Sequence, residues 1–213
     1  MKIFFLAVIS SLFFSSAPRH TQHPTTINLF DGKTFNGWQG DTIHTWRIEN
    51  GALVGGSLIE TVPHNDFLAT LQTFKNFDLQ LQFKLTGTGF VNAGVQVRSQ
   101  RLANPDYEMA GYQADLGEGY WGSLYDEARR NKTLAQPDSL VIKRILHTND
   151  WNHYRIRCNG KKIHIWLNDV LTVDYTEEEE DTIAQSGLIA LQIHGGGKAE
   201  VAYRNLQLTR LPD

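Results

Sequence analysis

Strict alternation between apolar and polar side chains is the feature that most constrains the fold of this chain. From Phe77 to Leu85 every second residue is phenylalanine or leucine, and aspartate, glutamine and lysine stand between them. Side chains two apart lie on the same face of a strand, so the pattern predicts a strand with one buried face. Before Glu177 no segment shows a sustained helical period, and only Thr176 to Gln185 is a candidate for a short helix. The chain is therefore predicted to be nearly all β.

Two tight turns support this prediction. Asn50-Gly51 stands between the short runs Trp46 to Glu49 and Ala52 to Val54, and Asn168-Asp169 stands between Lys162 to Leu167 and Val170 to Tyr175. Such dipeptides favour two-residue hairpins. Further strands are expected at Phe67 to Gln72, Val91 to Ser99, Gly111 to Leu116, Asn152 to Cys158, Gly187 to His194 and Glu200 to Leu208. Many short antiparallel strands favour two packed sheets, one of which can curve to give a concave binding face.

The first residues lie outside the alternating pattern. Lys2, the apolar run Ile3 to Phe14 and the small residues 15–17 are typical of a secretory signal, and the run is too short to span a membrane. We expect a signal peptide at residues 1–17, a linker at 18–26 and a single β-sandwich domain at 27–211. The protein is then exported, to the periplasm or the extracellular space, with no membrane span.

Charge and cysteine content restrict the partners and the source of stability. The net charge is −3 and no basic patch appears, which argues against a nucleic-acid partner. The acidic run Glu177 to Asp181 is interpreted as a solvated turn or loop. Cys158 is the only cysteine, so no internal disulfide can form, and its place in an alternating run predicts a small core residue.

The stretch Tyr107 to Arg130 concentrates aromatics, amides, carboxylates and arginines between glycines. That mixture suits a sugar, which has apolar ring faces and a hydroxyl edge. In addition, three expected strands each carry two polar residues on one face: Gln96 and Arg98, Gln113 and Asp115, Gln192 and His194. A solvated outer face is the alternative for each pair, but amides, arginine and histidine form directed hydrogen bonds. If the strands share a sheet, we expect these pairs to form the polar floor of a site.

The chain resembles the 3-keto-disaccharide hydrolase family over nearly all of its expected mature length. The matching fragments are Leu29-Phe30-Asp31-Gly32-Lys33 with Gly37-Trp38, Trp46 to Leu53, Asn76 to Leu79, Asn92 to Arg98, Tyr112 to Asp115, Trp121 to Glu127, Asp150 to Asn152, Leu167 to Asp169, Gly187 to His194 and Tyr203 to Leu206. Two features depart from the family pattern: Ala93 replaces a common serine, and Tyr107-Glu108 lies further upstream than the usual tyrosine-glutamate pair. The resemblance implies an all-β, two-sheet antiparallel jelly-roll sandwich of the concanavalin A-like lectin and glucanase type.

The resemblance also implies a substrate with a ketone at C3 of glucose. A base then removes the acidified C2 proton, the aglycone is eliminated, and water adds back. The expected catalytic residues are Asp115, His194, Arg98 and Glu127, with Asp115 or His194 as base and Arg98 as enolate stabiliser. The expected saccharide-binding residues are Gln96, Gln113, Gln192, Trp121, Tyr125 and Asp126.

Two alternatives stay open at this stage. Asp126 and Glu127 are a second acid or base candidate, and with Asp115 and His194 they could ligate a divalent metal that polarises the ketone. The metal is left unassigned. A non-catalytic carbohydrate-binding module on the same sandwich would need the same aromatics and amides.

Overall fold

The computed structural model describes residues 25–179, 183 and 185–212. The predicted signal peptide and all but the end of the predicted linker lie outside this range, so these two predictions are not tested. Within the candidate helix Thr176 to Gln185, Thr176 ends a strand and residues 177–179 are not helical; residues 180–182 and 184 lie outside the described part.

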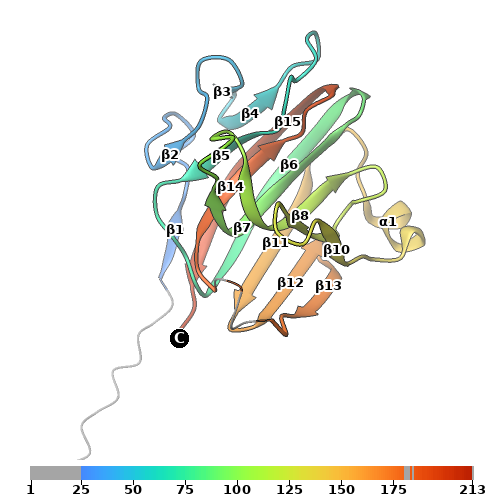
Figure 1. Ribbon diagram of the computed structural model, residues 1–213. Coiled ribbons are helices and arrows are strands. Elements are labelled where there is room, and N and C mark those ends of the chain that lie inside the picture. Colours follow the sequence, from blue (N-terminus) through green and yellow to red (C-terminus); the bar gives the residue numbers. More distant parts are fainter. Residues whose placement is uncertain (1–24, 180–182, 184, 213) are drawn as a thin grey trace, which may run out of the picture.

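Two antiparallel sheets make up the fold, as the alternation predicted (Figure 1). In spatial order, sheet A contains β13 (Val170–Thr176), β12 (Lys162–Leu167), β11 (Asn152–Asn159), β6 (Phe77–Gly89), β15 (Gly197–Arg210), β4 (Ala52–Gly56) and β3 (Trp46–Glu49), and β1 (Thr26–Asn28) also pairs with β15. Sheet B contains β10 (Lys132–Ala135), β9 (Leu124–Glu127), β8 (Met109–Gly117), β7 (Asn92–Arg101), β14 (Leu188–Ile193), β5 (Asp66–Thr70) and β2 (Trp38–Gln39).

The core lies between the two sheets and contains the apolar half of each alternating strand. In β6, Leu79, Leu81 and Phe83 are at most 1% exposed, whereas Gln80 between them is exposed. Cys158 of β11 is fully buried in the same cluster, as its position in the pattern predicted. Burial of this apolar surface supplies the main stabilisation of a chain without an internal disulfide.

Both predicted hairpins are present. Asn50 and Gly51 connect β3 to β4 with φ angles of 49° and 73°, and Asn168 and Asp169 connect β12 to β13 with 47° and 66°. A two-residue turn with positive φ at both positions matches the twist of the flanking strands, and asparagine, aspartate and glycine tolerate it best.

The helix α1 (Ser139–Ile145) was not predicted from the sequence. It is seven residues long, too short to show a period, and it follows β10 at the side of the sandwich (Figure 1). The side chain of Asp138 caps it by accepting a hydrogen bond of 2.8 Å from the Leu140 amide. In the described part of the chain, no helix is both long and apolar enough to cross a membrane.

Candidate active site

The three strands expected to form the polar floor are neighbours in sheet B, in the order β8, β7, β14. Their amides meet across the sheet. Gln113 donates through Nε2 to Asp115 Oδ1 at 2.8 Å and to Gln192 Oε1 at 3.0 Å, and its own Oε1 accepts from Gln96 Nε2 at 3.2 Å. Gly94 leaves the space for this network, because a Cβ there would lie 2.7 Å from Cγ and Cδ of Gln113. The network holds the Gln113 amide and the Asp115 carboxyl in one orientation.

A pocket of about 150 Å³ lies over this floor, and we call it the carboxylate pocket. It is lined by Phe90, Asn92, Gln113, Asp115, Tyr120, Tyr125, Glu127 and His194. Strands β8 and β9 and the loop between them contribute five of these side chains. The other three come from the start of β7 and the end of β14, where the His194 amide bonds the Asn92 carbonyl at 3.0 Å. The pocket combines exposed aromatic rings with carboxyl and amide groups, which is the composition that a sugar site requires.

Two carboxyl groups in this pocket have strongly raised pKa values. Burial raises the pKa of Asp115 to about 7; the hydrogen bond from Gln113 acts in the opposite direction, and the charge of Glu127 raises it further. Burial also raises the pKa of Glu127 to about 7, with further contributions from the charges of Glu108 and Asp126. Each group therefore has access to both protonation states near neutral pH, as a general acid or base requires.

Glu108 lies near the pocket without lining it, and His194 lines the pocket. Burial raises the pKa of Glu108, while a hydrogen bond with Asn65 and the charge of His194 act against that rise. His194 Nδ1 lies 2.8 Å from the Gly195 carbonyl oxygen, which can only accept, so Nδ1 carries a proton and Nε2 holds the lone pair of the neutral ring. Sequence reasoning did not place Glu108 in the site. The loop between β7 and β8 brings its charge close enough to raise the pKa of Glu127, although Glu108 does not line the pocket.

Arg98 does not reach the carboxylate pocket, so its expected place on the floor was wrong. The pairing of β7 shifts between Val97 and Gln100, and Arg98 has a φ of 50°, so the alternation breaks at this residue. The Arg98 side chain is 1% exposed and donates to the carbonyl oxygens of Lys75 and Gly160 at 2.9 and 2.8 Å. Arg98 thus ties β7 to the loop before β6 and to the turn between β11 and β12.

Asp126 also faces away from the pocket, so its expected role in saccharide binding is not supported. In β9 the side chains alternate, and Asp126 is fully buried while its neighbours Tyr125 and Glu127 are half-buried at the pocket. Arg129 donates to Asp126 through Nε at 2.5 Å, and Arg130 donates to its other oxygen. Asp126 is therefore part of a buried ion-pair cluster.

Three further residues predicted to bind the saccharide do not line the carboxylate pocket: Gln96, Gln192 and Trp121. Gln96 and Gln192 are fully buried and lie beneath Gln113; within the described residues Gln96 Oε1 and Gln192 Nε2 have no hydrogen-bond partner. They position Gln113 and do not line the pocket. Trp121 stacks on Phe83 of the core, with ring centroids 6.1 Å apart, and lines a different pocket.

The position where the family commonly has serine is also informative. Ala93 is fully buried in the hydrophobic core, on the face of β7 opposite the pocket. A hydroxyl at this position would not point into the carboxylate pocket. Within the described residues, no three histidine, cysteine, aspartate or glutamate side chains are grouped so that they could hold a metal ion.

The sequence was compared with the profiles of known protein families, and one family matches. The profile of the 3-keto-alpha-glucoside-1,2-lyase-like domain matches residues 25–209, which is most of the chain. The chain belongs to this family. A 3-keto-disaccharide hydrolase of Bacteroides thetaiotaomicron is 34% identical over 88 residues, which correspond to 38% of this chain and 29% of that protein. The match thus spans less than a third of the relative's length.

Solved structures similar to this member of the 3-keto-alpha-glucoside-1,2-lyase-like family confirm the sandwich fold. A candidate glycosyl hydrolase from Parabacteroides distasonis superimposes with a TM-score of 0.67 at 20% identity, over 88% of this chain and 94% of the other. A carbohydrate-binding module of Bacillus subtilis gives 0.62 at 16% identity, over 80% and 94%. The laminarinase catalytic domain of Thermotoga maritima gives 0.54 at 13% identity, over 89% and 98%. At these identities the similarity concerns the fold alone.

Proposed function

We propose that this chain cleaves 3-keto-glucosides, including 3-keto-disaccharides, by C2 proton abstraction, elimination of the leaving group at C1 and addition of water. One observation carries the proposal: Asp115 and Glu127 line the same pocket, and burial raises the pKa of each to about 7. Membership of the 3-keto-alpha-glucoside-1,2-lyase-like family supports the substrate class.

The chemistry follows from the ketone. A carbonyl at C3 makes the C2 proton acidic, because the resulting negative charge is delocalised onto O3. When the carbonyl forms again, the electron pair makes a C1–C2 double bond and the C1–O bond to the aglycone breaks. The leaving oxygen takes one proton. Water then adds to C1 while C2 regains a proton, which gives 3-keto-glucose and the free aglycone.

Two proton carriers suffice for this sequence, and the carboxylate pocket offers two coupled carboxyl groups. Because the charge of Glu127 raises the pKa of Asp115, the pair retains one proton over part of the neutral range. We assign the ionised member as the base at C2 and the protonated member as the acid at the leaving oxygen. Because the two carboxyls titrate as a pair, the roles of base and acid belong to the pair and are not assigned to individual residues.

The negative charge on O3 requires a hydrogen-bond donor. Neither arginine nor lysine is among the described side chains that line the pocket. The Asn92 amide and the hydroxyls of Tyr120 and Tyr125 can donate, and His194 donates through Nε2 when its ring is protonated. These donors take the role that the sequence analysis gave to Arg98.

The pH dependence follows from the same pair. The rate should rise as the base loses its proton and fall when the acid loses its own, which produces a bell-shaped profile centred near pH 7. The two limbs report the pair and not individual residues.

The direct test is incubation of the purified protein with 3-keto-trehalose, followed by detection of free 3-keto-glucose. Turnover supports the enzyme. Saturable binding without release of 3-keto-glucose would contradict it and support a carbohydrate-binding module, which the exposed rings of Phe90 and Tyr120 would also suit. We further propose that the protein acts outside the cytoplasm, and N-terminal sequencing of the exported form tests that.

A further inference from the structure

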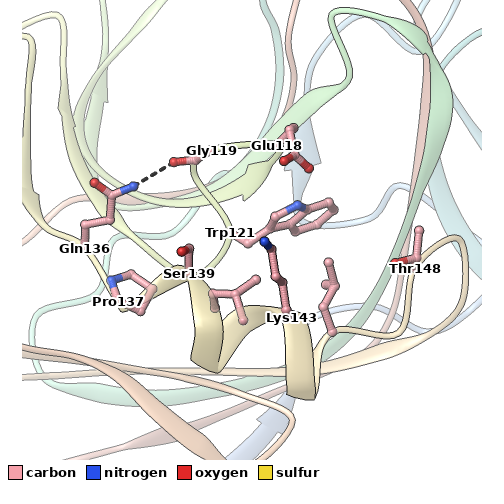
Figure 2. A pocket seen from close by; sticks show the side chains of 10 residues that line it. Glu118, Gly119, Trp121, Gln136, Pro137, Ser139, Lys143 and Thr148 are labelled. Atoms are coloured by element: carbon pink, nitrogen blue, oxygen red, sulfur yellow. Dashed lines mark hydrogen bonds between the residues drawn. The ribbon is translucent and has the colours of Figure 1, made fainter.

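A second pocket, of about 310 Å³, lies beyond Trp121, between the loop that joins β8 to β9 and the helix α1 (Figure 2). Its side chains are of the kinds that recognise a sugar. Figure 2 shows Lys143 extending from α1 toward the Trp121 indole, with Glu118 on the loop on the other side. Ile142 and Leu146 add apolar surface from the helix. The proposed function makes no use of this space.

An intermediate pocket adjoins both this second pocket and the carboxylate pocket. It has a volume of about 270 Å³ and lies at the end of β6. The intermediate pocket shares Phe90 with the carboxylate pocket, and it shares Glu118, Trp121 and Thr148 with the second pocket. We call the intermediate and second pockets, which share these three lining residues, the Trp121 groove.

The groove has fixed walls. The Trp121 indole stacks on Phe83 of the core with an interplanar angle of 18°, and the Gln136 side chain donates to the Gly119 carbonyl oxygen at 2.7 Å. The first contact holds the indole and the second ties the loop to the segment before α1 (Figure 2). A rigid aromatic face with flanking charged and amide groups is suited to a ring that has an apolar face and a hydroxyl edge.

We propose that the Trp121 groove binds the leaving group of the substrate and that this leaving group is a saccharide, with Trp121 as its stacking residue. This inference rests on the proposed function, because the groove can hold a leaving group only if the reacting sugar occupies the carboxylate pocket, with which the groove shares Phe90. Neighbouring residues of one loop line the two spaces: Tyr120 lines the carboxylate pocket and Trp121 lines the groove. One loop thus contacts the sugar on both sides of the bond that breaks.

The test compares two substrates with the same 3-keto-glucosyl group. One is maltotriose oxidised at C3 of its non-reducing glucose, and the other is methyl 3-keto-α-glucoside, whose leaving group cannot fill the groove. The measured quantity is the ratio of kcat/KM for the first over the second. We expect the ratio to fall about tenfold in Trp121→Ala, from loss of stacking, and about threefold in Lys143→Ala, from loss of a hydrogen bond.

Lys143 is exposed, so its replacement should leave the fold intact even if Trp121→Ala unfolds the end of the sandwich. Arg144→Ala is the matched control, since Arg144 is exposed on the same helix and does not line the groove; its ratio should equal that of the wild type. An unchanged ratio in both Lys143→Ala and folded Trp121→Ala would overturn the inference.

Failure of the proposed function would be visible separately. If the wild type cleaves neither substrate, the groove can still be tested by titration with maltotriose while the indole Nε1–H resonance of Trp121, assigned through Trp121→Phe, is followed by NMR. A saturable shift of that resonance supports a saccharide-binding groove. A resonance that does not move contradicts it.

Discussion

Two adjacent residues of β9, Asp126 and Glu127, face opposite sides of sheet B and lie in opposite electrostatic environments. Asp126 accepts hydrogen bonds from Arg129 and Arg130, and Arg130 also binds Glu177 at 2.7 Å. Burial alone would raise the pKa of Glu177, but hydrogen bonds from Arg130 and Tyr112 outweigh it and lower that pKa to about 2. No arginine or lysine is among the described residues lining the pocket on Glu127's side, and its pKa rises to about 7.

The comparison shows how one strand serves both stability and chemistry. Carboxylates that lose water need compensation, and arginine fork donors supply it in the cluster of Asp126, Arg129, Arg130 and Glu177. Where compensation is absent, the cost of burial appears as a raised pKa, and the group becomes able to exchange protons near pH 7. The ion pairs of Asp126 therefore fix the position of β9 and, with it, the Glu127 side chain at the pocket.

The largest effect should come from removing a proton carrier. Asp115→Asn and Glu127→Gln should each lower kcat for 3-keto-trehalose by about 10²- to 10⁴-fold, because an amide cannot accept or release the proton. Asp174→Asn makes the same change on the exposed surface of β13 and should retain wild-type activity. Wild-type rates in both pocket variants would remove the carboxyl pair from the mechanism.

The next effect concerns Asp126, the residue of β9 that pairs with Arg129 and Arg130. Asp126→Asn should lower the free energy of unfolding by about 3 kcal/mol, since the carboxylate that faces two guanidinium groups is lost inside a fully buried environment. Urea denaturation monitored by tryptophan fluorescence would measure it. A loss below about 0.5 kcal/mol, typical of an exposed pair, would mean that the cluster does not stabilise β9.

The third effect is a dependence of stability on pH. Because the folded-state pKa of Asp115 is raised from 3.8 to about 7, its favourable contribution is complete below about pH 4 and is lost as pH rises through about 7. Asp115→Asn should therefore gain about 3 kcal/mol of stability relative to the wild type between pH 5 and pH 8. Paired denaturation curves at the two pH values test this, and a constant difference would show that Asp115 ionises normally.

The smallest effect concerns the Gln113 network. In Gly94→Ala the new Cβ would lie 2.7 Å from the Gln113 side chain, which must shift and weaken its bond to Asp115. That bond lowers the pKa of Asp115, so weakening it should raise the pKa values of the carboxyl pair and move the acidic limb of the activity profile to higher pH by up to about one unit. A limb that stays in place would indicate that Gln113 does not tune the carboxyl.

Sequence alternation predicted the fold and part of the site, because period-two patterns report which face of a strand is buried. Gln113, Asp115 and His194 meet at the pocket for that reason. Arg98 does not, since a bulge in β7 changes the phase of the strand and the local sequence carries no sign of it.

Long-range contacts explain the remaining differences. Glu177 stands in an acidic run that was interpreted as solvated, yet it is 1% exposed because Arg130 and Tyr112, far away in the sequence, bind it. In β9 two acidic residues are adjacent, so composition alone could not tell which one faces the pocket. Trp121 and Tyr125 were both expected to bind the saccharide, but the two rings line different pockets.

In the proposed mechanism, cleavage begins when one member of the carboxyl pair Asp115 and Glu127 removes the C2 proton of the substrate. The most direct measurement uses 3-keto-trehalose carrying deuterium at C2, with mass analysis of the released 3-keto-glucose and an enzyme-free incubation as the blank. The account predicts slower turnover than with the unlabelled substrate and loss of deuterium from the glucosyl product to water. Release of 3-keto-glucose that retains its C2 deuterium, at an unchanged rate, would contradict it and indicate direct hydrolysis at C1.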